Sequence, residues 1–127
     1  MKTLSDRVDE YLLQERSISN ILDVEIALPM AVAATRFYAG YAAIESHADL
    51  DPAPAISPDT EISNSEWSVI RPLFVLYTEK ESAIQLEATG MLGVGMHGRS
   101  SSEVGQEITQ IEMEMPKRAF VQDIITV

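Results

Sequence analysis

The sequence predicts an all-α protein, a bundle of about four helices, with an extended C-terminal β-type arm. Apolar residues recur at helical spacing in successive stretches, and aromatic residues make up only 6% of the 127-residue chain. A core with so few aromatic side chains must be built from Leu, Ile, Val, Ala and Met, which favours helices over a sandwich or barrel. The length predicts one helical domain, residues 1–118, followed by the arm at residues 119–127.

The charge and the absence of cysteine exclude several classes of function. Twenty acidic and nine basic side chains give a formal net charge of -11, and no segment collects positive charge. Nucleic-acid binding needs Lys and Arg to neutralise phosphates, so direct DNA or RNA binding is not expected, and an anionic membrane would be repelled. A chain without cysteine has no disulfides, no thiol catalysis and no zinc site that uses sulfur. The N-terminus turns acidic without a following apolar run, so no secretory signal is expected.

The first predicted helix spans residues 5–16, where Val8, Tyr11 and Leu12 share one face. Acidic residues lie near its N-terminal end, where negative charge suits the helix dipole. Asn20, followed three residues later by Asp23, can then cap a second helix.

Residues 26–48 form the most apolar stretch of the chain, and only Arg36 and Glu45 carry charge after Glu25. A helix that is apolar almost all round must be covered on most sides. Pro29 suits its first turn or a kink just before it. A transmembrane span is the alternative interpretation, but Arg36 lies in the middle of the stretch and no basic flank follows. The main core stripe is predicted to be Ile26, Met30, Ala33, Phe37, Tyr41 and Ile44.

Residues 49–63 are predicted to form a flexible loop. Pro52, Pro54 and Pro58 deny a helix both its hydrogen-bond donors and its dihedral angles. A loop of this length is unusual in a compact domain, so we expect it to lie against a partner.

A long helix is predicted to begin at Ser63 or Ser65, where Glu66 can complete a capping box. Pro72 is expected to bend this helix, and Gly90 to end it. A second apolar row beside the main one widens the buried face. The main row is Trp67, Ile70, Phe74, Tyr77, Ile84, Ala88 and Met91.

A glycine-rich loop at residues 90–99 precedes the last predicted helix, which serine residues 100–102 can cap. Pro116 is expected to close this helix. Its core stripe is predicted to be Val104, Ile108, Ile111 and Met115.

The arm at residues 119–127 is rich in β-branched side chains and predicts a strand. No other segment offers this strand an obvious pairing partner. Its backbone groups are therefore expected to bond in a sheet shared with another chain. The alternative is a terminal segment that lies along the helices or frays.

No catalytic, cofactor-binding or metal-binding site is predicted. Gly93, Gly95 and Gly98 match G-x-G-x-x-G, but a helix precedes the motif and no βαβ unit is present, so a turn is expected. His47 and His97 lack metal-ligand spacing and are expected at the surface.

Three carboxylates of the long helix could serve acid-base chemistry or bind a cation. In a chain with 20 acidic residues, however, such a group is typical of a solvated helix face. The serines at residues 100–102 lack a nucleophile elbow and are expected to be caps. We therefore expect that the protein is not an enzyme. The three carboxylates are Glu79, Glu81 and Glu87.

The second half of the chain resembles the head-to-tail connector (head completion) proteins of tailed bacteriophages. The resemblance to their long helix lies in Ser63-Asn64-Ser65-Glu66-Trp67-Ser68-Val69-Ile70-Arg71-Pro72-Leu73-Phe74 and continues to Ala88. The segments Gly98-Arg99-Ser100-Ser101-Ser102-Glu103-Val104 and Phe120-Val121-Gln122-Asp123-Ile124-Ile125-Thr126-Val127 add to it.

The resemblance implies a structural virion protein of the neck, assembled in the host cytoplasm and not in a membrane. It would form a homo-oligomeric ring, commonly of about twelve copies, between the portal protein and further connector or tail proteins. DNA would pass through its channel without specific binding, because an acidic lumen repels phosphates. The alternative is a small acidic helical adaptor or regulatory protein of a bacterial host. In the connector, the arm residues expected to bind a neighbouring subunit or the portal are Phe120, Val121, Ile124, Ile125 and Val127.

Overall fold

The structure is a computed structural model that describes residues 1–15, 23–88 and 100–126; the side chains of Glu15 and of residues 120–126 lie outside the described part. Within these ranges the chain forms four α-helices and one two-stranded antiparallel sheet, so the prediction of a mainly helical protein is confirmed. In chain order the elements are β1 (Lys2–Thr3), α1 (Leu4–Glu10), the π-helical turn η1 (Tyr11–Glu15), α2 (Val24–Ala39), the 3-10 turn η2 (Glu45–His47), β2 (Glu61–Ile62), α3 (Asn64–Ala88) and α5 (Ser101–Thr126).

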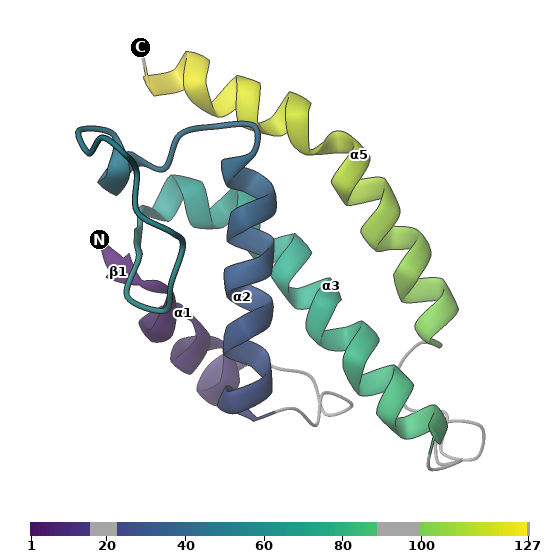
Figure 1. Ribbon diagram of the computed structural model, residues 1–127. Helices are drawn as coiled ribbons and strands as arrows, with labels where there is room; N and C mark the ends of the chain where they lie inside the picture. Colours follow the sequence, from purple (N-terminus) through teal and green to yellow (C-terminus); the bar gives the residue numbers. More distant parts are fainter. Residues whose placement is uncertain (16–22, 89–99, 127) are drawn as a thin grey trace.

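The long helix α3 lies at the centre of the fold and packs against both α2 and α5 (Figure 1). α1 packs against α2 on the side away from α5. The core between these helices is mainly aliphatic, and its aromatic part is a run of ring contacts. The ring of Phe74 lies 5.1 Å from that of Tyr11, edge to face, and 5.5 Å from that of Trp67.

The first helix forms where it is predicted, with Leu4 and Val8 fully buried. The Thr3 hydroxyl caps it by accepting a hydrogen bond from the Asp6 backbone N–H at 3.1 Å. The helix continues as the π-helical turn η1, in which Tyr11 is buried and Leu13 is exposed.

The buried side of helix α2 is offset by one residue from the predicted core stripe, which is about 100° around the helix. Small residues and one tyrosine face α1 and α3, while Ile26, Ala33 and Tyr41 are exposed and Phe37 is half-buried. The prediction is therefore wrong for Ile26, Ala33 and Tyr41. Half-buried Met30 and Phe37 pack against the core, and Ile44 is buried as predicted, beyond the end of the helix. The helix also ends earlier than expected, at Ala39. The buried residues are Ala27, Ala31, Val32, Ala34, Thr35 and Tyr38.

The predicted loop at residues 49–63 ends in a short strand that the sequence pattern does not predict. In this strand Glu61 pairs with Thr3, and Ile62 pairs with Lys2. The loop is held further to the N-terminus because the Leu4 backbone N–H donates to the Thr60 carbonyl at 3.0 Å. At this end the loop is therefore bound to its own chain, while the expected contact with a partner chain stays a prediction.

The start of α3 is fixed by the predicted capping box and by two buried charged side chains. The Ser63 hydroxyl accepts from the Glu66 backbone N–H at 3.2 Å, and the Glu66 carboxylate accepts from the Ser63 N–H at 3.0 Å. The other carboxylate oxygen of buried Glu66 accepts from the Glu45 N–H at 2.9 Å. Arg7, also buried, donates to the Ile62 carbonyl at 2.7 Å and to the side chain of Asn64 at 3.0 Å. One cluster thereby connects α1, η2, β2 and α3.

Neither internal proline of the last two helices ends its helix. α3 contains Pro72 and changes direction after its first turns, as expected for a proline in a helix interior (Figure 1). α5 continues through Pro116, so the prediction that this residue closes the helix is wrong. Met115 and Ala119 on either side of it are fully buried, and this packing offsets the lost backbone hydrogen bond. The predicted α5 stripe is confirmed, with Val104 and Ile108 buried and Ile111 half-buried.

The backbone of α5 is helical as far as Thr126, through the stretch for which the sequence predicts an extended arm. The side chains at residues 120–126 and all of Val127 lie outside the described residues, and so do Asn20 and the whole glycine-rich loop at residues 90–99. The role of the arm in docking therefore stays a prediction.

Replacing Glu66 by Ala is expected to lower the free energy of unfolding by about 2 kcal/mol, because the capping bond is lost and the backbone N–H of Glu45 in η2 loses its acceptor. Urea unfolding with an unchanged m-value measures this loss. Glu103→Ala is the matched control, since Glu103 occupies the same position after the capping Ser100 of α5 but is exposed. Equal losses in the two variants would show that the buried carboxylate contributes nothing beyond an ordinary first-turn acid.

Candidate interaction surface

One side of α2 is an apolar surface that the described part of the chain leaves uncovered. We call it the outer α2 face and define it as Glu25, Ile26, Pro29, Ala33, Arg36 and Phe37. Five of these residues are exposed, Ile26 to 38%, and Phe37 is half-buried beside the exposed ring of Tyr41, at a centroid distance of 5.6 Å. In Figure 1, α2 lies in front of α3, so this helix closes one side of the bundle.

Ile26 and Phe37 lie on the outer α2 face because close packing of the inner side against the neighbouring helices favours small side chains there. Ala27, Ala31 and Ala34 are fully buried, and their small side chains let the helix lie close to its neighbours. Thr35 is also buried, and its hydroxyl donates to the Ala31 carbonyl at 2.8 Å, so it needs no other partner. Pro29 lies on the exposed side, where the Glu25 carbonyl that it leaves unbonded can be solvated.

The charges on the outer α2 face are few and lie along one edge. Between Glu25 and Glu45 the only charged residue is Arg36, in a chain that carries 20 acidic residues. Glu25 and Arg36 are both exposed, and neither forms an ion pair within the described part of the chain. This surface therefore has no net formal charge.

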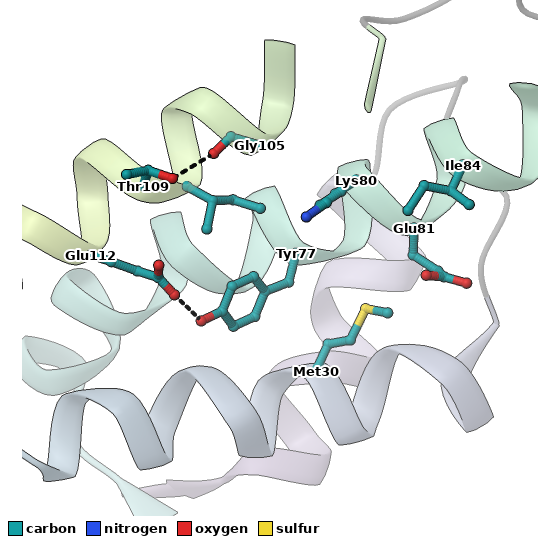
Figure 2. Close-up of a pocket in the computed structure, with 9 residues that line it drawn as sticks. Met30, Tyr77, Lys80, Glu81, Ile84, Gly105, Thr109 and Glu112 are labelled. Carbon is teal, nitrogen blue, oxygen red and sulfur yellow. Dashed lines mark hydrogen bonds between the residues drawn. The ribbon is translucent and has the colours of Figure 1, made fainter. Parts of the chain in front are cut away.

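A groove of about 470 Å³ lies between α3 and α5, with Met30 of α2 at its floor (Figure 2). Its polar groups include the Lys80 ammonium, the Glu81 and Glu112 carboxylates and the Thr109 hydroxyl. The Tyr77 hydroxyl donates to the Glu112 carboxylate at 2.9 Å across the groove, and this bond ties α3 to α5 (Figure 2).

The Tyr77 hydroxyl is held as a hydrogen-bond donor to Glu112. Burial raises the pKa of Tyr77 well above its ordinary value, and the hydrogen bond to Glu112 and the negative charge of that carboxylate raise it further. The phenol therefore keeps its proton at physiological pH and connects α3 to α5 through this bond. The sequence pattern predicts Tyr77 as a core residue together with Trp67 and Phe74; the latter two are buried, whereas Tyr77 is half-buried.

Two further grooves border the bundle. One, of about 540 Å³, lies between the C-terminal end of α2 and the loop after η2, with apolar walls and with Arg36 and His47 among its lining residues. The other, of about 530 Å³, lies on α3 and α5 around Pro72 and Arg118. Arg118 also forms an ion pair with Glu114, one turn earlier on α5, at 3.4 Å.

The structure does not bring the three α3 carboxylates together as one site. Glu81 lines the groove of Figure 2 and accepts a hydrogen bond from Gln85 at 3.4 Å. Glu87 instead binds the start of α5: the Ser101 backbone N–H and hydroxyl donate to its two oxygens at 2.9 and 2.7 Å. Glu79 does not line this groove.

The remaining candidates have structural positions or lie outside the described residues. His47 is half-buried in η2, and Ser100 caps α5 by accepting from the Glu103 N–H at 3.2 Å, as predicted. Among the described residues no group of three His, Asp or Glu side chains could hold a metal ion. In the same part of the chain, every helix is too short or too polar to cross a membrane. His97, the glycine motif and the side chains of the predicted interface residues Phe120, Val121, Ile124, Ile125 and Val127 fall outside it.

Comparison with models of protein families, with characterised proteins and with solved structures finds no match for this chain. The outer α2 face, the buried position of Glu66 and the Tyr77–Glu112 bond are the features that the sequence pattern does not indicate. Each depends on which helices become neighbours.

Replacing Glu87 by Gln is expected to reduce stability at neutral pH, with a difference that disappears in acid. The two hydrogen bonds from Ser101 lower the pKa of Glu87 in the folded state, so the ionised carboxylate stabilises the fold above its ordinary pKa of 4.5. This stabilisation is lost as the pH falls through the lowered pKa. Urea unfolding of both proteins from neutral pH to strong acid measures the effect, and a pH-independent difference would contradict it.

Replacing Gly105 by Ala is expected to raise the free energy of unfolding by about 1 kcal/mol, because alanine favours the helix and the site has room. An added Cβ would lie 4.0 Å from the Lys80 side chain, an ordinary contact. At Gly40 the added Cβ would lie 3.3 Å from the Phe37 carbonyl oxygen, so Gly40→Ala is the matched control with a smaller gain or a loss. Thermal unfolding compares the two variants, and destabilisation by Gly105→Ala would refute this account.

Proposed function

We propose that this chain is a structural assembly protein, a head-to-tail connector subunit of a tailed bacteriophage located in the virion neck. It acts through contacts with other protein surfaces: copies of itself in a ring, the portal protein, and further connector or tail proteins. The observation that carries an assembly role is the outer α2 face, an apolar helix side that stays exposed while small residues fill the core.

The groups present on the described surface favour binding over chemistry. The groove of Figure 2 contains a tyrosine that keeps its proton and a glutamate that already accepts its hydrogen bond. The Glu87 carboxylate likewise already accepts hydrogen bonds, from the backbone N–H and the hydroxyl of Ser101. These groups hold α3 to α5, and a rigid pair of long helices is a suitable support for an assembly surface.

The connector assignment is supported by the resemblance of residues 63–88 and of the segments near residues 98–104 and 120–127. In the fold, the first of these segments is α3, the helix against which α2 and α5 pack. The net charge of -11 agrees with a channel that lets DNA slide, because acidic walls repel phosphates. A small acidic adaptor or regulatory protein of a bacterial host would share the helical fold and the charge, but it would not bind a portal ring.

Deleting residues 120–127 is expected to leave a folded helical protein that no longer joins portal rings. The deletion begins at residue 120 because Ala119 is fully buried and belongs to the core. Co-sedimentation of the chain with purified portal rings measures joining, and circular dichroism confirms that the truncated chain is folded. Undiminished binding of the truncated chain would show that residues 120–127 are not needed to join portal rings. Failure of the full-length chain to bind any portal would favour the adaptor function.

A further inference from the structure

We propose that two copies of this chain pair through their outer α2 faces, with the two helices antiparallel and related by a two-fold axis between Pro29 and Ala33. The inference is independent of the connector assignment, because it concerns the isolated chain. It rests on the exposed apolar residues of this face and on the position of its two charges.

A second copy is the occupant that the charges favour. Two molecules that each carry a net charge of -11 repel one another over most of their surfaces. The stretch from residue 26 to residue 44 contains no acidic side chain, so the outer α2 face is where two copies can approach with the least repulsion.

The apolar residues of the face match one another in the antiparallel arrangement. Pro29 and Ala33 are one helical turn apart and exposed, and each would lie opposite the other residue in the second copy. Ile26 precedes the midpoint between them by five residues and Phe37 follows it by six. With a rise of about 1.5 Å per residue, Ile26 of one copy would therefore lie nearly level with Phe37 of the other.

The charges of the face match in the same arrangement. Glu25 and Arg36 lie six residues before and five residues after the same midpoint, on the edge of the face opposite to Ile26 and Phe37. In a two-fold antiparallel pair, equivalent edges of the two helices meet. Glu25 of each copy would then face Arg36 of the other, which gives two ion pairs from side chains that have none within the described chain.

The pair is expected to be weak and reversible. A 16-residue helix is about 24 Å long, and one helix pair of this length buries less surface than a stable dimer usually does. A two-fold contact also closes on itself, so it cannot propagate a ring. The pair would be a form of the free subunit, and the two copies would have to separate before the outer α2 face could contact another protein in the assembly.

Charge reversal tests the register directly. Sedimentation velocity of the full chain over a concentration series up to about millimolar is expected to show a monomer–dimer equilibrium. Glu25→Arg and Arg36→Glu should each weaken it at least about tenfold, since like charges then face one another. Mixing the two variants should produce a heterodimer of about native affinity, because every Glu25–Arg36 position again holds opposite charges.

A neutral substitution provides a second test. Ala33→Gln keeps a good helix former at an exposed position but fills the centre of the contact, so dimerisation should fall at least about tenfold with the thermal midpoint unchanged. Ala88→Gln, at an exposed alanine of α3, is the matched control and should dimerise as the native chain does. A chain that is monomeric throughout, a mixture that forms no heterodimer, or equal effects of both glutamines would each overturn the proposal.

Discussion

The burial of two charged side chains at the start of α3 constrains the rest of the fold. A buried charge is tolerated only where hydrogen bonds replace its water, so Glu66 and Arg7 fix the position of every group that they bond. Glu66 binds the N-terminus of α3 and the backbone of η2, while Arg7 binds β2 and the first residue of α3 and lies 6.0 Å from the Trp67 ring. Among the buried side-chain nitrogen and oxygen atoms of the described residues, only Arg7 Nε has no hydrogen-bond partner. Once this cluster is formed, α1, β2 and α3 have one relative arrangement.

From this fixed end, α3 extends as the support for the other helices. α2 crosses it through small side chains, and α5 runs beside it, held by the Tyr77–Glu112 bond in the middle and by Glu87 and Ser101 at the far end. Polar contacts thus hold α5 at two points along its length, whereas α2 is held by apolar packing. Because the buried inner side of α2 already holds this helix against its neighbours, its outer side can carry exposed apolar side chains such as Ile26.

The exposed apolar face of α2 can attract other protein surfaces, whereas the acidic residues elsewhere repel like charges. Contacts between proteins form where apolar area can be buried without bringing like charges together, and the outer α2 face meets that condition. The acidic residues elsewhere keep other surfaces apart from one another and from phosphates. Both properties agree with the assembly function that we propose.

Local patterns in the sequence determined the helices, the capping box of Ser63 and Glu66, and the buried stripe of α5, because caps and helical periodicity depend only on neighbouring residues. The tertiary structure alone decided which side of α2 faces the core. Periodicity fixes the angles between residues around a helix, but it cannot choose between two sides that are both apolar. The choice came from packing distance, which favoured Ala27, Ala31 and Ala34. Core packing also keeps α5 helical through Pro116. The pairing of β2 with β1 likewise joins segments that are far apart in the sequence, so neither outcome can be predicted from a few neighbouring residues.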